Sequence, residues 1–373
     1  MSAHPEPDAD VLVVGAGPAG LALGAALADA GLTVTLLEQQ TLLALQDPPE
    51  DGREIALTHR ARGVMERLGL WAAISPAEVA PLREAKVVDG GSPQVLHFGD
   101  APRAGGQPLG WLVSNHLIRR AAWQAATARP GLTLRCEARV TGIERGADHV
   151  AVQLADGGRL RGRLLVAADS RFSDTRRRAG IGAAMHDFGR SVVVGRVRHT
   201  RDHAGTAWEC FRYGNTLALL PMNGGMASAV VTLPSDQAPE WLALSDEAFA
   251  ARIQAQSEGR LGAMTAAGPR HHYPLVGVYA QRFVAHRFAL IGDAAVGMHP
   301  VTAHGWNFGL YGVEVLARQL AAARRSGGDI GALATLLPYE REHRATTLPV
   351  WLGTNAIVGL FTDERRLPRL ARR

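Results

Sequence analysis

The chain has 373 residues, of which 47% are hydrophobic and 20% charged, and its formal net charge is +5. This length suits about two domains with a buried core, and no block of Lys or Arg is interleaved with aromatic residues, so we expect no nucleic-acid partner. Cys136 and Cys210 are the only cysteines and form no CxxC pair, which predicts a reducing compartment without a metal–thiolate site.

The N-terminal residues predict a dinucleotide-binding unit. Residues 1–9 are short and polar and contain no signal-peptide core, so we expect a cytoplasmic chain. An apolar strand over Val11–Val14 leads into Gly15-Ala-Gly17-Pro-Ala-Gly20 and then into an Ala/Leu-rich helix that ends at about Ala30. A second strand follows over Thr33–Leu37, and Glu38 comes directly after it. The order strand, GxGxxG, helix, strand and acid is typical of a Rossmann-like βαβ unit.

Each element of this motif has an expected task. Gly15 permits the tight turn, Gly17 lets the backbone approach a pyrophosphate, and Gly20 lets the helix pack closely on the strand. Glu38 would accept hydrogen bonds from a ribose diol, and it would repel the 2′-phosphate of NADP.

The next polar positions allow two interpretations each. Asp51-Gly-Arg53 precedes a predicted helix over Thr58–Leu68, and Arg53 would contact the phosphates or ribityl chain of a cofactor or remain a surface arginine. Ser114 and Arg119 open another helix, where they would line the cofactor channel or form a helix cap and a solvated face.

The stretch from 131 to 168 predicts strands, with a turn at 156–158, and Asp169 ends the last of them. Ligands bind at the carboxyl edge of a doubly wound sheet, so Asp169 is a candidate contact. Arg176, Arg177 and Arg178 form a cationic cluster that marks either the basic start of a helix or a second loop against the same cofactor.

From about residue 181 the pattern changes to short β-branched and aromatic runs separated by turns, which predicts an antiparallel sheet followed by a helix over Ser245–Gln256. We expect a separate substrate domain here. Its apolar residues would either wall a pocket or simply form the core of the sheet; the candidates are Trp208, Phe211, Tyr213, Leu219 and Pro221.

The stretch Ala289–Leu310 is the expected reactive end of the protein. A buried strand over Phe288–Ile291 ends at Gly292-Asp293, and a cramped loop with Pro300 and several alanines follows. The chain becomes helical after Gly305, with Asn307 in the first turn. A strand end, an acid and a helix N-terminus suit a large anionic cofactor, although an ordinary strand–helix connection has the same form.

The C-terminal part predicts helices, with a break at Ser326-Gly-Gly328 and an interruption near Pro349. The apolar stretch 347–361 is too short and glycine-broken to span a bilayer. It would contact a membrane surface with the arginines that follow it, or pack against the core or a partner. The sequence shows no cluster of metal ligands.

Together these motifs resemble the single-component FAD-dependent aromatic hydroxylases with the fold of p-hydroxybenzoate hydroxylase. The resemblance rests on Gly15–Gly20 with Glu38, on Asp169–Ser173 with Arg176, and on Gly292-Asp293 through Pro300 to Asn307. Within that family the chain is most similar to the ubiquinone-biosynthesis hydroxylases, and among these to the 5-demethoxyubiquinol hydroxylase group, because of Asp51-Gly-Arg53 and the segments AWECFRYGNTLALLPM and HPVTAHGWNFGL.

The resemblance implies an α/β (α+β) fold, with a Rossmann-like FAD/NAD(P)-binding domain, an inserted antiparallel-sheet substrate domain and C-terminal helices. It assigns residues 1–72, 111–180 and 282–373 to the FAD-binding domain, and 73–110 and 181–281 to the substrate domain. It implies polar contact near the flavin for His304, and FAD contacts for Gly15, Gly17, Pro18, Ala19, Gly20, Glu38, Gln39, Arg53, Ser114, Arg119, Val140, Asp169, Gly292, Asp293, Pro300, Ala303, Gly305, Trp306 and Asn307.

The implied activity is hydroxylation of the ring of a polyprenylated phenol or quinol. Reduced FAD would react with O2 to give a C4a-hydroperoxide, and NAD(P)H or another donor would supply the electrons transiently. The implied partners are a quinone-biosynthesis complex or a membrane surface on its inner face. Two alternatives stay open: a C=C reductase of the same fold, and a non-catalytic flavin-binding subunit, which Ser170 in place of the family's glycine keeps open.

Overall fold

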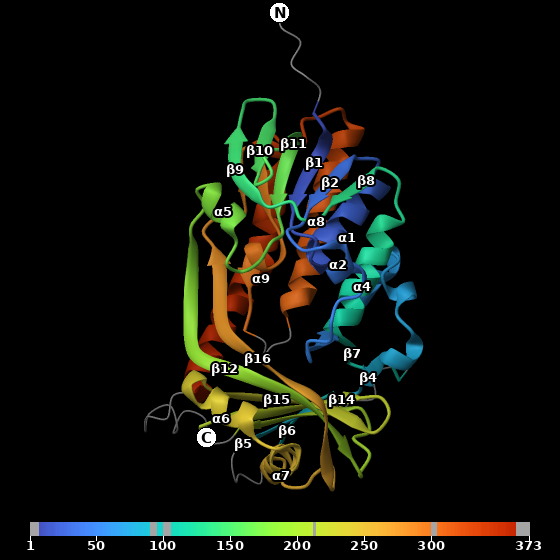
Figure 1. Cartoon of the computed structure of the whole chain (residues 1–373), viewed down its shortest axis with the longest axis vertical. Coiled ribbons are helices and arrows are strands. Elements are labelled where there is room, and N and C mark those ends of the chain that lie inside the picture. The colour runs from blue at the N-terminus through green and yellow to red at the C-terminus, as the bar shows by residue number, and fades with distance from the viewer. Residues whose placement is uncertain (1–6, 90–94, 100–105, 212–213, 300–303, 363–373) are drawn as a thin grey trace, which may run out of the picture.

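The computed structural model describes residues 7–89, 95–99, 106–211, 214–299 and 304–362 (Figure 1). One large sheet with its helices occupies the upper part of the molecule in that view, and a second large sheet lies below it. The long strands β12 and β16 run from the upper part into the lower sheet, so the two layers are connected by continuous backbone.

The first sheet contains the predicted βαβ unit. Its strands follow the order β17-β18-β11-β1-β2-β8, and β1 lies parallel to both β2 and β11. The central strands are almost wholly apolar and buried, as expected of a parallel sheet covered on both faces. The strands are β1 (Ala9–Val14), β2 (Val34–Leu37), β8 (Leu132–Arg135), β11 (Arg159–Ala167), β17 (Val284–Ala285) and β18 (Phe288–Leu290), with β9 (Val140–Arg145) and β10 (Val150–Leu154) attached to β11.

Helices cover this sheet. The predicted first helix is α1, and it packs against α4 and α8, while α9 packs on α8. The helix predicted after Thr58 is α3, and the Thr58 hydroxyl caps it by accepting from the Ala61 N–H. The helices of the upper part are α1 (Pro18–Asp29), α2 (Leu42–Gln46), α3 (His59–Arg67), α4 (Asn115–Thr127), α5 (Asp174–Arg178), α8 (Gly305–Arg325) and α9 (Leu333–Thr362).

The predicted interruption near Pro349 is wrong, because α9 is continuous with Pro338 and Pro349 inside it. A proline removes one helix hydrogen bond. Tertiary packing offsets that loss here: Tyr339, His343 and Thr347 are fully buried at helical spacing, and the Tyr339 hydroxyl donates to the Leu290 carbonyl.

The second sheet follows the order β19-β16-β12-β15-β14-β13-β5-β6, and a small third sheet has the order β3-β7-β4. The second sheet consists of β5 (Glu84–Asp89), β6 (Val95–Phe98), β12 (Ala183–His199), β13 (Thr206–Phe211), β14 (Thr216–Met222), β15 (Met226–Pro234), β16 (Met264–Ala280) and β19 (Val296–Gly297). The small sheet consists of β3 (Glu54–Leu57), β4 (Ala80–Leu82) and β7 (Gly110–Ser114). Short 3-10 turns lie at Trp71–Ala73, Pro76–Glu78, Ser235–Gln237 and Gly292–Ala294.

The two faces of the second sheet have different surroundings. We call the face that packs on α6 (Ala238–Ala243) and α7 (Asp246–Gln256) the outer face; its core includes Cys210, Leu217 and Leu219. The opposite, inner face carries Val194 and Tyr273 and meets residues 50–54 of the upper part, where the Tyr273 hydroxyl donates to the Asp51 carbonyl.

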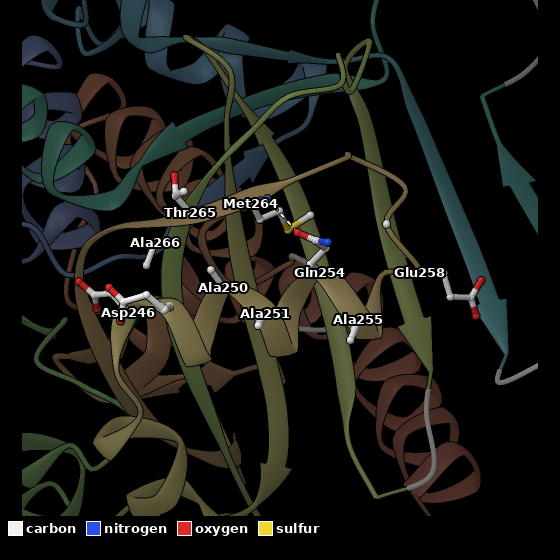
Figure 2. A pocket seen from close by; sticks show the side chains of 11 residues that line it. Asp246, Ala250, Ala251, Gln254, Ala255, Glu258, Met264, Thr265 and Ala266 are labelled. Carbon is white, nitrogen blue, oxygen red and sulfur yellow. Dashed lines mark hydrogen bonds between the residues drawn. The ribbon is translucent and has the colours of Figure 1, made fainter.

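A groove of about 610 Å³ lies beside α7 on the outer side (Figure 2). Its lining consists of Asp246, Glu247, Ala250, Ala251, Gln254, Ala255, Glu258, Gly259, Met264, Thr265 and Ala266. None of the residues predicted to bind a cofactor or substrate contributes to it, so it is not the candidate site.

Candidate cofactor site and active site

The glycine-rich loop between β1 and α1 has one open position. Gly15 has φ +104°, and a Cβ there would lie 2.7 Å from the Ala168 carbonyl oxygen. A Cβ on Gly20 would lie 2.0 Å from the Gly15 oxygen, so both positions exclude a side chain for reasons of packing. A Cβ on Gly17 would meet nothing within 4 Å. The loop therefore presents bare backbone to open space only at Gly17, at the N-terminus of α1 where an anion is favoured.

Glu38 lies just beyond β2, next to this loop. Its carboxylate accepts from the Ala16 N–H over 2.7 Å and from the Gln40 N–H over 2.9 Å, and the residue is 8% exposed. These bonds fix the side chain, while a carboxylate has about four acceptor positions in all. Two positions are therefore left for a ribose diol. Gln39, the neighbouring candidate, is exposed.

Asp169 organises the loop after β11. Its carboxylate accepts from the Ser173 hydroxyl over 2.5 Å and from the Thr175 N–H over 3.2 Å. Ser173 in turn accepts from the Arg176 N–H and caps α5. Asp169 thus holds its own loop, as a capped helix start predicts.

Arg176 joins this loop to the one after β18. It is 2% exposed, and its guanidinium donates to the Ala294 carbonyl over 2.9 Å. Burial lowers the pKa of Arg176, partly offset by Asp169. The sequence marked Arg176 as part of a cationic cluster and of the motif around Asp169–Ser173. Its burial could not be predicted from three consecutive arginines.

Asp293 lies in the short turn after β18 and pairs with Arg171, whose guanidinium donates to its carboxylate over 2.8 Å. Gly292 before it has φ +57°, a backbone conformation that suits glycine. Arg171 also donates to the Val276 carbonyl of β16. Sequence reasoning missed Arg171 as a partner of Asp293, because 122 residues separate the two.

Asn307 holds the start of α8 against the small sheet. Its side-chain oxygen accepts from both the N–H and the hydroxyl of Thr58, and its amide donates to the Ala56 carbonyl over 2.8 Å. The Asn307 side chain therefore contacts other protein residues. For contact with a cofactor, the start of α8 has the backbone of Gly305, Trp306 and Asn307.

The ring of His304, the N-cap of α8, lies 5.0 Å from that of Phe308. Pro300 and Ala303, two further candidates, lie outside the described residues. His299 next to them is 5% exposed, and its ring lies 4.7 Å from that of Phe188. Burial, assisted by Arg190 and Arg171, lowers the pKa of His299 to about 4, so it is neutral at physiological pH.

A polar cluster connects the small sheet to the inner face. Arg53 pairs with Asp51 over 2.6 Å and lies over the ring of Tyr273. Ser114 donates its hydroxyl to Glu54 over 2.8 Å instead of capping α4, and Arg196 of β12 pairs with the same Glu54. Burial raises the pKa of Glu54, against the opposing effects of Ser114 and Arg196. Glu54 and Arg196 were not predicted.

Arg119 is a partly exposed residue on α4, and Val140 is a buried residue at the start of β9. The structure thus brings the glycine loop, Glu38 and the loops of Asp169 and Asp293 to one edge of the first sheet, the carboxyl ends of β1, β2, β11 and β18.

Comparison with known proteins decides what this edge holds. The sequence model of the family described as "FAD binding domain" matches residues 8–348. The chain is 47% identical to "Ubiquinone hydroxylase UbiM" of Neisseria meningitidis, over 100% of this chain and 80% of that protein. It is 41% identical to "Ubiquinone hydroxylase UbiL" of Rhodospirillum rubrum, over 98% of this chain and 84% of that one. The chain belongs to this family of FAD-dependent monooxygenases.

Solved structures agree on the fold of this monooxygenase. Pseudomonas aeruginosa PqsL, in complex with 2-aminobenzoylacetate, superposes with a TM-score of 0.82 at 23% identity, covering 98% of this chain and 100% of that one. The p-nitrophenol 4-monooxygenase PnpA of Pseudomonas putida has a TM-score of 0.77 at 20% identity, covering 97% and 91%. The resemblance to FAD-dependent hydroxylases and the predicted α/β fold with several sheets and C-terminal helices are confirmed.

FAD fits the edge of the sheet. The open backbone at Gly17 lies where a pyrophosphate needs close approach. Two acceptor positions remain on Glu38, and α8 packs against the turn that carries Asp293. Among the described residues no group of three or more His, Cys, Asp or Glu is arranged to hold a metal ion.

The apolar residues predicted either to wall a pocket or to form the core of the sheet lie on two different faces of the second sheet. Trp208 and Leu219 pair with each other across β13 and β14 and pack into the core of the outer face. Pro221 follows on the same face, opposite Ala227. Phe211 alternates with Cys210 and so lies on the inner face, while Tyr213 lies outside the described residues. Trp208, Leu219 and Pro221 therefore lie on the opposite side of the sheet from Phe211. Aromatic content alone did not reveal which face each strand residue occupies.

Proposed function

We propose that this protein hydroxylates the aromatic ring of a polyprenylated phenol or quinol in ubiquinone biosynthesis, with O2 as the oxygen source. The observation that carries the proposal is the 47% identity over the whole chain to a protein named as a ubiquinone hydroxylase. A second relative, at 28% identity, is the 3-demethoxyubiquinol 3-hydroxylase of Escherichia coli.

Bound FAD supplies the oxygen-activating chemistry. In our proposal the loop of Gly15, Gly17 and Gly20 binds its pyrophosphate through the open backbone at Gly17, and Glu38 binds the adenosine ribose. Asp293 binds the ribityl or phosphate region, and the backbone of 305–307 contacts the flavin. The protein must also exclude water and hold the ring close to the flavin, and these tasks need neither a metal nor a catalytic triad.

The sequence contains a single GxGxxG motif, so it offers no second dinucleotide-binding unit for the reductant. We therefore propose transient binding of NAD(P)H, as is typical of the family. No contact among the described residues favours the C=C reductase or the non-catalytic subunit, and both are excluded if the experiment below shows ring hydroxylation.

We further propose that the protein contacts the membrane surface, because a polyprenylated substrate resides there. Leu352 on α9 is 54% exposed, and five arginines follow this helix in the sequence. Within the described ranges no helix has the length and hydropathy to cross a bilayer. Flotation with anionic and neutral vesicles tests this contact: we expect co-migration with anionic vesicles, and Leu352→Ser should reduce it. Absence from both vesicle fractions would refute it.

The function is tested by complementing a strain that lacks its own ring hydroxylase with this chain. Mass spectrometry of the accumulated quinone intermediates should show a product heavier by one oxygen. Unchanged intermediates would refute the hydroxylase assignment. An assay of the purified protein with a soluble quinol analogue separates the alternatives. A reductase would add hydrogen to the analogue without incorporating oxygen from O2. A non-catalytic subunit would leave the analogue unchanged.

A further inference from the structure

Helix α9 carries a buried pair of polar side chains to which the site described above gives no task. Tyr339 is 0% exposed, and His343, one helical turn later, is 1% exposed. The Tyr339 hydroxyl donates to the Leu290 carbonyl over 2.5 Å, and its oxygen lies 3.1 Å from Nδ1 of His343. Buried polar groups are costly unless they form hydrogen bonds, so these two bonds fix where both side chains lie.

The bond to Leu290 replaces a main-chain bond of the β17–β18 hairpin. Leu290 follows the paired residues of this hairpin, and its N–H donates to the Phe283 carbonyl. In a regular antiparallel ladder the Phe283 N–H would donate back to the Leu290 carbonyl. Here the Phe283 N–H donates to the Glu340 carboxylate, and Tyr339 supplies the donor for Leu290. Two consecutive side chains of α9 therefore take the place of one bond of the ladder.

This replacement occurs where β18 ends and the cofactor edge begins. Leu290 is the last residue of β18 and precedes Asp293 by three positions. The next residue, Ile291, donates its N–H to the Ala167 carbonyl of β11. The chain is thus held from α9 at one residue and from β11 at the following one, directly before the turn that carries Asp293.

His343 holds the Tyr339 hydroxyl in this position. A phenol has one proton, and that proton is donated to Leu290, so towards His343 the phenol oxygen accepts and Nδ1 carries the ring proton. Burial lowers the pKa of His343 to about 4 and raises the pKa of Tyr339, so both groups are neutral at physiological pH. The His343 ring also packs on α8 at Gly312, where a Cβ would lie 2.7 Å from its Cε1.

We propose that Tyr339 is a positioning residue for FAD, which fixes the turn of Asp293 through the Leu290 carbonyl, with His343 holding its hydroxyl. With no exposed surface, Tyr339 cannot contact a bound cofactor itself. The inference rests on the contact between Asp293 and FAD that belongs to the proposed function.

The competing role for Tyr339 is to stabilise the fold without any effect on the cofactor. Loss of the hydroxyl would then lower the free energy of unfolding and leave the FAD affinity of the folded protein unchanged. Tyr279 provides the matched control, because it is 5% exposed and its hydroxyl also bonds to α9, at Thr347 over 3.1 Å. That bond ends on a side chain, so its loss leaves the main chain before Asp293 in place.

The test compares the wild-type apoprotein with Tyr339→Phe and Tyr279→Phe, below the melting temperature of all three. In a fluorescence titration with FAD we expect Tyr339→Phe to bind about 3- to 10-fold more weakly, the equivalent of one neutral hydrogen bond. Tyr279→Phe should bind FAD as wild type does. Amide hydrogen exchange of residues 290–295 in the apoprotein should be faster in Tyr339→Phe and unchanged in Tyr279→Phe.

The other results would overturn the proposal. Equal FAD affinity in the three proteins would mean that Tyr339 serves the fold alone, and equal weakening by both variants would show that the bond to Leu290 is not the cause. If Tyr339→Phe does not fold, Gly312→Ala takes its place, because the added methyl group displaces His343 from Tyr339; wild-type affinity there has the same meaning. Asp293→Asn is titrated alongside, and wild-type affinity in that variant would refute the contact of Asp293 with FAD, whichever result Tyr339→Phe gives.

Discussion

Alanine substitutions at Gly17 and Gly20 should separate flavin binding from folding. At Gly20 the added Cβ would lie 2.0 Å from the Gly15 carbonyl oxygen, so the loop or α1 must shift by about an ångström. Overpacking of this kind costs about 1–3 kcal/mol and occasionally more, and we expect Gly20→Ala to lower the free energy of unfolding by about 3 kcal/mol. At Gly17 the added Cβ meets no atom within 4 Å, and φ is −67°. The cost there should stay below about 1 kcal/mol.

Although Gly17→Ala should cost little stability, it should weaken the binding of FAD. A methyl group at the only open point of the loop prevents the pyrophosphate from reaching the backbone N–H groups of α1. Loss of one hydrogen bond to a charged group costs about 1.5–3 kcal/mol, which corresponds to roughly 10- to 150-fold weaker binding. Urea unfolding of the apoprotein and a fluorescence titration with FAD measure the two quantities separately. Wild-type FAD affinity in Gly17→Ala, or equal destabilisation by both variants, would refute the assignment of Gly17 to the pyrophosphate.

Three further substitutions test other parts of the site. Asp293→Asn should reduce the FAD content of purified protein while changing apoprotein stability by no more than about 1 kcal/mol, because its pair with Arg171 is partly exposed; a fully yellow variant would mean that Asp293 does not contact flavin. Arg176→Met should lower the free energy of unfolding by about 1–3 kcal/mol, since two buried carbonyls lose their donor; chemical denaturation checks this. Burial lowers the pKa of His343 to about 4, so the unfolded chain binds this proton first as pH falls below about 6.5. Stability should therefore decline by about 3 kcal/mol between pH 7 and 4, and His343→Gln should flatten that decline; an unchanged pH slope would contradict the burial of a neutral histidine.

Local patterns predicted the βαβ unit at the N-terminal end of the chain well. The order of apolar strand, glycine loop, helix and Glu38 is confined to about thirty residues, and each part has a short-range physical cause. The structure adds contacts between residues far apart in the chain. Asn307 with Thr58, Arg171 with Asp293 and Arg196 with Glu54 join segments more than a hundred residues apart, and no spacing rule relates such pairs.

The second sheet shows another kind of limit to prediction from the sequence. Hydrophobic residues such as Trp208 and Leu219 were natural candidates for a pocket, but a sheet buries its best apolar residues against its own helices. The opposite face carries smaller and half-exposed residues, such as Ala218 and Thr216. Composition cannot distinguish the two faces; the register of β13 against β14 and β5 does so, because it fixes which residues share a side.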